Sequence, residues 1–97
     1  MEISFSAPLW QWEARQDDAW WFVTVPVDES DLLADLPLPP RGFGSIRVEV
    51  TVGATTWRTS VFPSKESYVL PMKKAVRRAE GLGPGSRVDV RLSTIDL

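Results

Sequence analysis

The chain contains neither cysteine nor histidine among its 97 residues. Without cysteine it can form no disulfide and offers no thiolate as a nucleophile or a zinc ligand. Without histidine it lacks the side chain that most often transfers protons near neutral pH. These two absences exclude the usual structural zinc sites and the common cysteine- and histidine-dependent mechanisms. We therefore expect no cofactor, no bound metal and no enzymatic activity.

Long hydrophobic runs are also missing. No apolar stretch approaches the about 20 residues of a membrane-spanning helix, and the start Met1-Glu2-Ile3-Ser4 lacks the basic and apolar regions of a secretion signal. With 43% hydrophobic and 25% charged residues, the composition is typical of a folded globular chain. The length predicts one domain that covers residues 1–97. We expect a cytoplasmic protein without a membrane partner.

Charge is unevenly distributed, although the net charge is only −2. Residues 1–40 hold eight acids and one base, which gives −7, and residues 41–97 hold ten bases and five acids, which gives +5. Two interpretations stay open. The basic part could present a surface that attracts anions, or the two parts could pair electrostatically within one compact fold.

The last third of the chain has the most specific pattern. Tyr68-Val69-Leu70 predicts a short strand, because a residue before proline avoids the helical region. A helix is expected to begin at Pro71, and Gly81 is expected to end it in the left-handed conformation. The helix stripe predicted to be buried consists of Met72, Ala75, Val76 and Ala79.

A turn and a last strand follow this helix. Gly83-Pro84-Gly85 predicts a turn with a positive φ at Gly85. Beyond it, apolar residues alternate with charged ones, which predicts a strand with one solvent-exposed face formed by Arg87, Asp89 and Arg91.

This unit resembles the half-barrel of the AbrB/MazE-like transcription regulators. The resemblance rests on Leu70-Pro71, Lys74, Val76-Arg77, Leu82, Gly85 and Val88 to Val90. Ser86 stands where these regulators carry an acidic residue, and a serine can also make the local backbone hydrogen bond of such a turn. The resemblance implies half of a double-split barrel and the possibility of nucleic-acid binding.

The first part of the chain predicts two strands. Apolar residues occupy every second position from Ile3 to Leu9, whereas Trp10 and Trp12 fall on the intervening positions. A bulge near Pro8 would explain this change. The polar residues Glu13 to Asp18 are expected to turn the chain. The second strand, Trp20 to Val25, is apolar on both parities, which predicts that both of its faces are covered.

The middle of the chain predicts a helix and a hairpin. Asp28 is expected to cap a helix whose apolar side holds Leu32, Leu33 and Leu36, and a proline-rich linker follows through Pro39, Pro40 and Arg41-Gly42. Strands 46–52 and 55–62 then flank a two-residue turn at Gly53-Ala54, where a leading glycine suits a type II′ turn. Residues 63–67 are expected to form a polar loop.

Taken as a whole, the chain resembles a bacterial domain-of-unknown-function family of small double-split β-barrels, which are sometimes fused to a YdeI/OmpD-associated domain. The resemblance is carried by Phe5-x-Ala7 with Trp10, Trp20-x-Phe22-Val23-x-Val25-Pro26, Gly42-Phe43-Gly44-Ser45-x-Arg47-Val48, Trp57-x-Thr59-Ser60-x-Phe62-Pro63, and Tyr68 to Arg78 with Gly85 and Val88. It implies a mainly β fold, a pseudo-symmetric barrel of about six strands with two short helices, and it implies no catalytic residue. Since both half-barrels lie in one chain, we expect a monomer.

Few residues are candidates for catalysis or metal binding. Hydrolysis would have to use Ser60, Lys65 or Tyr68, and no base to activate them is identifiable. The acids Asp28, Asp31 and Asp35 lack the loop and spacing of a calcium site, and acids in a first helical turn already favour the helix dipole. No catalytic or metal site is predicted from them.

Two groups of residues are candidates for binding. The five tryptophans are expected to pack mostly in the core, but Trp10, Trp12 and Trp57 could stack on a small molecule. The basic helix and the last strand could instead bind anions or nucleic acid through Lys73, Lys74, Arg77, Arg78, Arg87 and Arg91. We predict a non-catalytic binding or interaction module, with nucleic-acid binding through the basic helix and small-molecule binding through tryptophans as alternatives.

Overall fold

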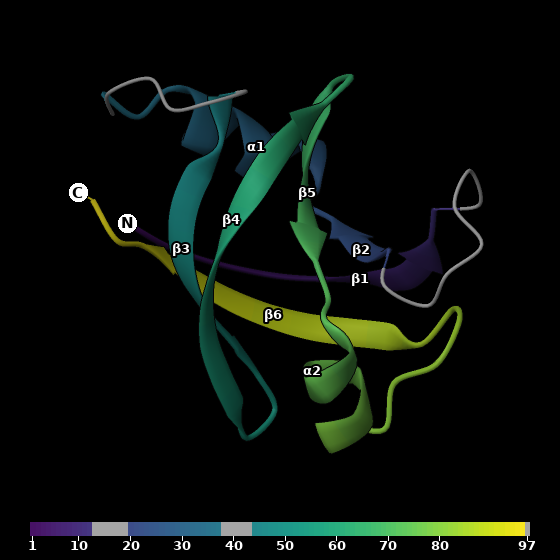
Figure 1. Ribbon diagram of the computed structural model, residues 1–97. Coiled ribbons are helices and arrows are strands. Elements are labelled where there is room, and N and C mark those ends of the chain that lie inside the picture. The colour runs from purple at the N-terminus through teal and green to yellow at the C-terminus, as the bar shows by residue number, and fades with distance from the viewer. Residues whose placement is uncertain (13–19, 38–43, 97) are drawn as a thin grey trace.

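The computed structural model describes residues 1–12, 20–37 and 44–96. Its strands form a closed antiparallel barrel in the order β1-β2-β5-β4-β3-β6, and two short helices, α1 (Val27–Ala34) and α2 (Lys74–Ala79), lie outside it (Figure 1). The strands are β1 (Glu2–Gln11), β2 (Trp21–Thr24), β3 (Ile46–Val52), β4 (Thr55–Ser64), β5 (Ser67–Pro71) and β6 (Arg87–Thr94). This confirms the predicted mainly β barrel. The turn predicted at Glu13 to Asp18 and the linker from Pro39 to Gly42 lie outside the described residues.

The barrel interior is a packed hydrophobic core. Alternate residues of every strand point inward, as the period of a β-strand requires. Two tryptophans, Trp21 and Trp57, belong to this core with Met72 and Val76 of the α2 segment. The other buried apolar residues are Ile3, Ala7, Leu9, Val23, Val25, Leu33, Ile46, Val48, Val50, Val52, Val61, Leu70, Val88, Val90 and Leu92.

Strand β1 passes from one neighbour to another. It pairs with β6 from Glu2 to Pro8 and with β2 from Leu9 to Gln11, without a change of register in either ladder. The predicted bulge near Pro8 is therefore wrong. The Leu9 N–H donates to Ser86 O at 2.8 Å, so the Pro8 nitrogen faces the opposite edge, where pairing with β2 has not yet begun. Proline costs no ladder hydrogen bond at such a position.

Strand β2 is covered on one face only. Trp21 and Val23 point into the core, whereas Phe22 is half-buried and Trp20, just before the strand, is exposed. The prediction that both faces are covered is wrong, because neither helix lies over the outer face of this strand closely enough to bury those rings. The segment is apolar at both even and odd positions because its outer face carries the aromatic residues Trp20 and Phe22.

Helix α1 begins after Pro26, which occupies the N-cap position and makes no side-chain cap hydrogen bond. Asp28, predicted as the cap, lies one residue inside the helix, where its charge favours the helix dipole. Leu33 is buried as predicted, but Leu32 is exposed. The helix is joined to β5 by Ser30, whose hydroxyl donates to Val25 O at 3.0 Å and accepts the Tyr68 N–H at 2.9 Å.

The β3–β4 and β4–β5 hairpins turn tightly. The predicted two-residue turn between β3 and β4 is confirmed, and Gly53 has a φ of 57° while Ala54 keeps a negative φ, as a type II′ turn requires. The polar loop predicted for residues 63–67 is wrong. Strand β4 continues to Ser64, β5 begins at Ser67, and Lys65 and Glu66 form the turn, with a φ of 48° at Lys65.

The segment around α2 differs from the prediction at its start. Pro71 is the last residue of β5, paired with Phe22, and the helix begins only at Lys74. Of the predicted buried stripe, Met72 and Val76 are buried, whereas Ala75 and Ala79 are exposed. Helix α2 instead turns the side chain of Arg77 toward the barrel.

The end of α2 and the following turn are as predicted. Gly81 has a φ of 64°, and the Gly81 N–H donates to Arg78 O while the Leu82 N–H donates to Arg77 O, the pair of bonds that defines a Schellman cap. Gly85 has a φ of 78°, which confirms the predicted positive φ. The Ser86 hydroxyl accepts the Gly83 N–H at 2.9 Å, so this serine makes the local hydrogen bond expected of it.

Candidate functional site

The four basic residues of the α2 segment do not share one surface. Lys73, Lys74 and Arg78 are exposed, but Arg77 is only 8% exposed. The Arg77 Nε–H donates to Met72 O at 3.0 Å, and the guanidinium carbon lies 5.0 Å from the centre of the Trp21 ring. Arg77 therefore packs the helix against the barrel and is turned away from any surface that a nucleic acid could reach.

The two arginines of β6 lie on the outer face of the barrel, among residues of both charge signs. Arg91 pairs with Ser4 of β1 and Thr51 of β3, and it borders a shallow depression of about 540 Å³ together with Asp89. The Arg87 Nη2–H donates to Ser6 O at 3.4 Å. With an acid between the two arginines, this face is mixed in charge.

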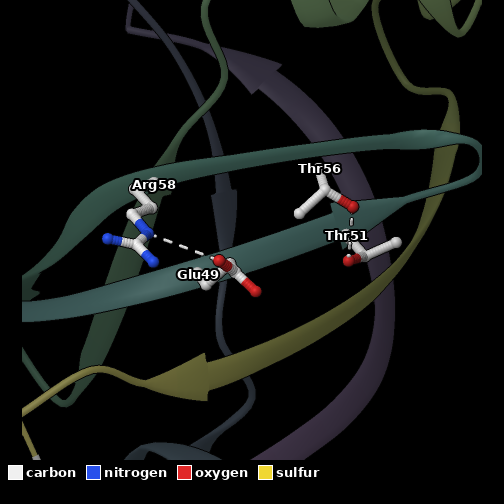
Figure 2. A network of polar contacts seen from close by, with 4 residues as sticks. All are labelled: Glu49, Thr51, Thr56 and Arg58. Carbon is white, nitrogen blue, oxygen red and sulfur yellow. Dashed lines mark hydrogen bonds and ion pairs between the residues drawn. The ribbon is translucent and has the colours of Figure 1, made fainter.

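Polar pairs continue across β3 and β4 (Figure 2). The Arg58 Nε–H donates to Glu49 Oε2 at 3.3 Å, and the hydroxyls of Thr51 and Thr56 lie 3.0 Å apart. The side chains of this ion pair are 66% and 46% exposed, so the pair contributes little to stability. This part of the outer surface is an ordinary solvated sheet face with no feature that indicates a ligand.

A different surface forms where β1 and β2 meet. Trp10 and Phe22 are directly paired across the two strands, with ring centres 5.2 Å apart. The ring centre of Trp20 lies 6.3 Å from that of Phe22 and 5.8 Å from that of Trp12. The rings of Trp12 and Trp20 are arranged edge to face. The four rings thus form a two-by-two cluster, with Trp10 opposite Phe22 and Trp12 opposite Trp20. Together with Phe62 of β4, we call these residues the aromatic face.

The strand period explains why these rings gather outside. Trp10 and Trp12, like Trp20 and Phe22, are two residues apart and so share one side of their strands, while Leu9, Trp21 and Val23 occupy the inner side. The pairing of β1 with β2 then places the outward-facing residues of the two strands opposite each other. Two further hydrogen bonds join the two strands, one from the Trp12 N–H to Trp20 O and one from the Trp10 indole to Thr24 Oγ1, both 2.9 Å.

The aromatic face is exposed and concave. Its members Trp10, Trp20 and Phe62 are each 36% exposed, and Trp12 is 44% exposed. A groove of about 610 Å³ runs along it, lined by Trp12, Trp20, Trp21, Phe22, Phe62, Pro63, Ser64, Val69 and Pro71. A second, smaller depression of about 340 Å³ shares Ser64 and Val69 with this groove and extends to Trp10 and the Lys65-Glu66 turn.

The three tryptophans proposed for stacking do not lie on one surface. Trp10 and Trp12 belong to the aromatic face, but Trp57 is only 9% exposed and lies inside the core. Sequence reasoning did not include Trp20, Phe22 and Phe62 among the binding candidates. The signal was present, since Trp20 and Phe22 share the parity opposite to the buried Trp21 and Val23, but that face was taken to be covered.

The residues considered for catalysis or metal binding are scattered. Ser60 pairs with Arg47 in the β3–β4 ladder, Lys65 lies in the turn after β4, and half-buried Tyr68 lies in β5. Within residues 1–12, 20–37 and 44–96, no three acidic side chains gather as metal ligands. No helix in the described part of the chain is long and apolar enough to cross a membrane.

The fold defines a class, that of small closed antiparallel barrels with a filled interior. The predicted resemblance to a domain-of-unknown-function family is confirmed. The family described as Domain of unknown function (DUF1905) matches residues 5–92, and the chain belongs to this family. No curated protein matches the sequence.

Proposed function

We propose that this domain is a non-catalytic binding module that uses the aromatic face to contact its ligand. The observation that carries the proposal is the cluster of four rings, Trp10, Phe22, Trp20 and Trp12, on the outside of a barrel whose interior is already filled. Single exposed apolar side chains need no explanation, but a contiguous apolar patch on a monomer often marks an interaction site.

The geometry of the groove supports the same proposal. Ligand sites are concave, about 300–1,000 Å³ in volume and lined mainly by apolar and aromatic side chains. The groove between Trp12 and Pro71 has a volume of about 610 Å³ and meets both conditions. Aromatic side chains bury much surface with few rotatable bonds, which makes them efficient contact residues.

Anion binding through the basic helix has weaker support. Of its four basic residues, Arg77 is engaged with Met72 and Trp21, and the arginines of β6 flank Asp89. Proteins that bind nucleic acid through charge need several cations on one accessible surface, because affinity grows with the number of phosphates contacted.

The proposal can be tested with anilinonaphthalene sulfonate, a dye whose fluorescence rises on exposed apolar surface. We expect saturable binding to the native protein, and a severalfold weaker signal for Trp12→Ser and for Phe62→Ser. Leu32→Ser is the matched control, because Leu32 is an apolar residue on α1 that is at least as exposed and lies outside the groove. The proposal fails if the native protein does not bind the dye, or if Leu32→Ser lowers the signal as much as Trp12→Ser does.

A further inference from the structure

The groove of the aromatic face restricts the chemistry of the ligand that it can hold. We propose that it binds a small molecule through a quaternary ammonium group, which is a fully alkylated cation without an N–H. This inference rests on the proposed function and adds the class of ligand. Three observations support it: the groove lies between two aromatic walls, its described lining carries no charge, and the exposed surface is small.

The groove follows β5, which lies between β2 and β4 in the barrel (Figure 1). Leu70 of β5 points into the core, so its neighbours Val69 and Pro71 point outward and form the floor of the groove. In the ladders Pro71 is paired with Phe22 of β2, and Val69 is paired with Phe62 of β4. Smaller side chains on the middle strand thus lie between larger rings on both neighbouring strands, which makes the outer face concave here.

The distance between the two walls suits a single cation. Neighbouring strands are about 4.7–4.9 Å apart, so β2 and β4 lie about 9.5 Å from each other across β5. A group centred over β5 therefore lies about 5 Å from the line of rings on either side. Because a cation is attracted to an aromatic face within about 6 Å of the ring centre, such a group is within reach of both walls.

The described residues that line the groove carry no charged side chain, and the Ser64 hydroxyl is their one side-chain hydrogen-bond acceptor. A primary ammonium group would leave N–H donors without partners there, which lowers affinity. A quaternary ammonium group has no donor to satisfy, and it is attracted by the negative faces of the rings. An anion would meet the same faces without a cation in the described lining to hold it. The composition of the groove therefore favours a fully alkylated cation.

The exposed area indicates a small ligand and not a folded partner. A tryptophan or phenylalanine side chain offers about 150–250 Å². At exposures of 36% to 44%, the rings of Trp10, Trp12, Trp20 and Phe62 together present about 230–380 Å². A protein interface of standard size buries about 800 Å² on each partner, at least twice as much. The groove volume of about 610 Å³ lies within the range of small-molecule sites.

The test compares choline with two analogues, in sodium chloride solutions of equal ionic strength. Ethanolamine has an ammonium group with N–H in place of the trimethylated group, and in the neutral isostere dimethylbutanol a carbon replaces the charged nitrogen. Amide-correlation NMR shows one indole N–H signal for each of the five tryptophans. We expect choline to shift the signals of Trp12 and Trp20 in a saturable manner and to leave that of buried Trp57 unchanged. Dimethylbutanol should bind about threefold to thirtyfold more weakly, because it lacks the cation–π attraction, and ethanolamine should shift neither signal.

Two variants test whether the wall on β4 contributes through its ring. Phe62→Leu removes this ring but keeps an apolar side chain, so it should weaken choline binding severalfold and change dimethylbutanol binding less. Phe5→Leu is the matched control, because Phe5 is a half-buried ring that lines the separate depression beside Asp89, and it should leave choline binding unchanged. A Trp57 signal at its native position in both variants shows that the barrel is still folded.

The inference is overturned if choline leaves the Trp12 and Trp20 signals in place, if dimethylbutanol binds as tightly as choline, or if Phe5→Leu weakens choline binding as much as Phe62→Leu does. If anilinonaphthalene sulfonate still binds the native protein and Trp12→Ser weakens that signal, the aromatic face remains a site for another ligand class. If the dye does not bind either, the proposed function fails as well.

Two further probes carry the same group on a larger partner, a trimethyllysine peptide on the protein side and phosphatidylcholine vesicles on the membrane side. We expect neither to bind more tightly than choline. Binding of either at least about tenfold tighter than that of choline would overturn the assignment of the ligand as a small molecule and assign the ammonium group to that partner.

Discussion

Replacing Arg77 by alanine should destabilise the barrel by about 2–4 kcal/mol. A buried hydrogen bond from a charged donor contributes about 1.5–3 kcal/mol, and the Arg77 Nε–H makes such a bond to Met72 O at 3.0 Å. The guanidinium over Trp21 adds about 0.5–2 kcal/mol. The two contributions come from one side chain and overlap, so the expected total lies below their largest sum.

Arg78→Ala is the matched control for this experiment. Arg78 is the next residue of the same helix and is exposed, so its replacement should change the free energy of unfolding by no more than about 0.5 kcal/mol. Urea denaturation of the two variants, analysed at a common slope, measures the difference. For a domain of this size, the expected loss in Arg77→Ala corresponds to a melting temperature lower by at least about 8 °C. Equal midpoints for the two variants would refute the structural role assigned to Arg77.

Three further outcomes are expected. Gly85→Val should destabilise by about 1–3 kcal/mol through backbone strain alone, because Gly85 has a φ of 78° and an added Cβ would meet no atom within 4 Å; an unchanged denaturation midpoint would contradict this. The protein should keep its far-UV circular dichroism on dilution to low nanomolar concentration, since the barrel closes within one chain; loss of the signal would indicate an obligate dimer. It should not retain duplex DNA even at about 20 mM salt, where counterion release favours binding most. Retention that disappears in the Lys73→Glu/Lys74→Glu variant would instead establish the basic helix as a nucleic-acid site.

The role of Arg77 changes how the basic helix can be tested. The predicted stripe of Met72, Ala75, Val76 and Ala79 leaves the four basic residues on the other side of the helix, and from the sequence alone a reversal of all four charges should spare the fold. Because Arg77 is buried against Trp21, such a variant would lose stability as well as charge. Only changes at the exposed residues separate binding from folding.

The strands were predictable because a single face of each is buried. The alternation in residues 46–52 and 87–94 matches the observed strands, and the glycines at 53, 81 and 85 adopt the positive φ that their turns require. These features depend on local backbone geometry, which the sequence carries directly.

The errors occurred where tertiary packing decides the outcome. The pattern around Pro71 suits a helix start, but the pairing of Pro71 with Phe22 extends the strand. Likewise, the basic run around Arg77 suggests an exposed side chain, and only the fold shows that Trp21 of β2 lies against it. The aromatic face was missed for the same reason, since periodicity identifies the two sides of β2 but not what covers each of them.

The pairing of the first strand with the last has a consequence for how quickly the barrel forms. Glu2 lies opposite Ser93, and the Thr94 N–H donates to Met1 O at 2.9 Å, so the two ends of the described chain lie side by side (Figure 1). Contacts between residues so distant in sequence must wait for the whole intervening chain to be ordered, which slows folding to the millisecond-to-second range typical of all-β domains. During synthesis on the ribosome, β1 has no β6 to pair with until residues 87–94 emerge. The apolar inner side of β1, with Ile3, Ala7 and Leu9, therefore stays accessible to chaperones until β6 has been made.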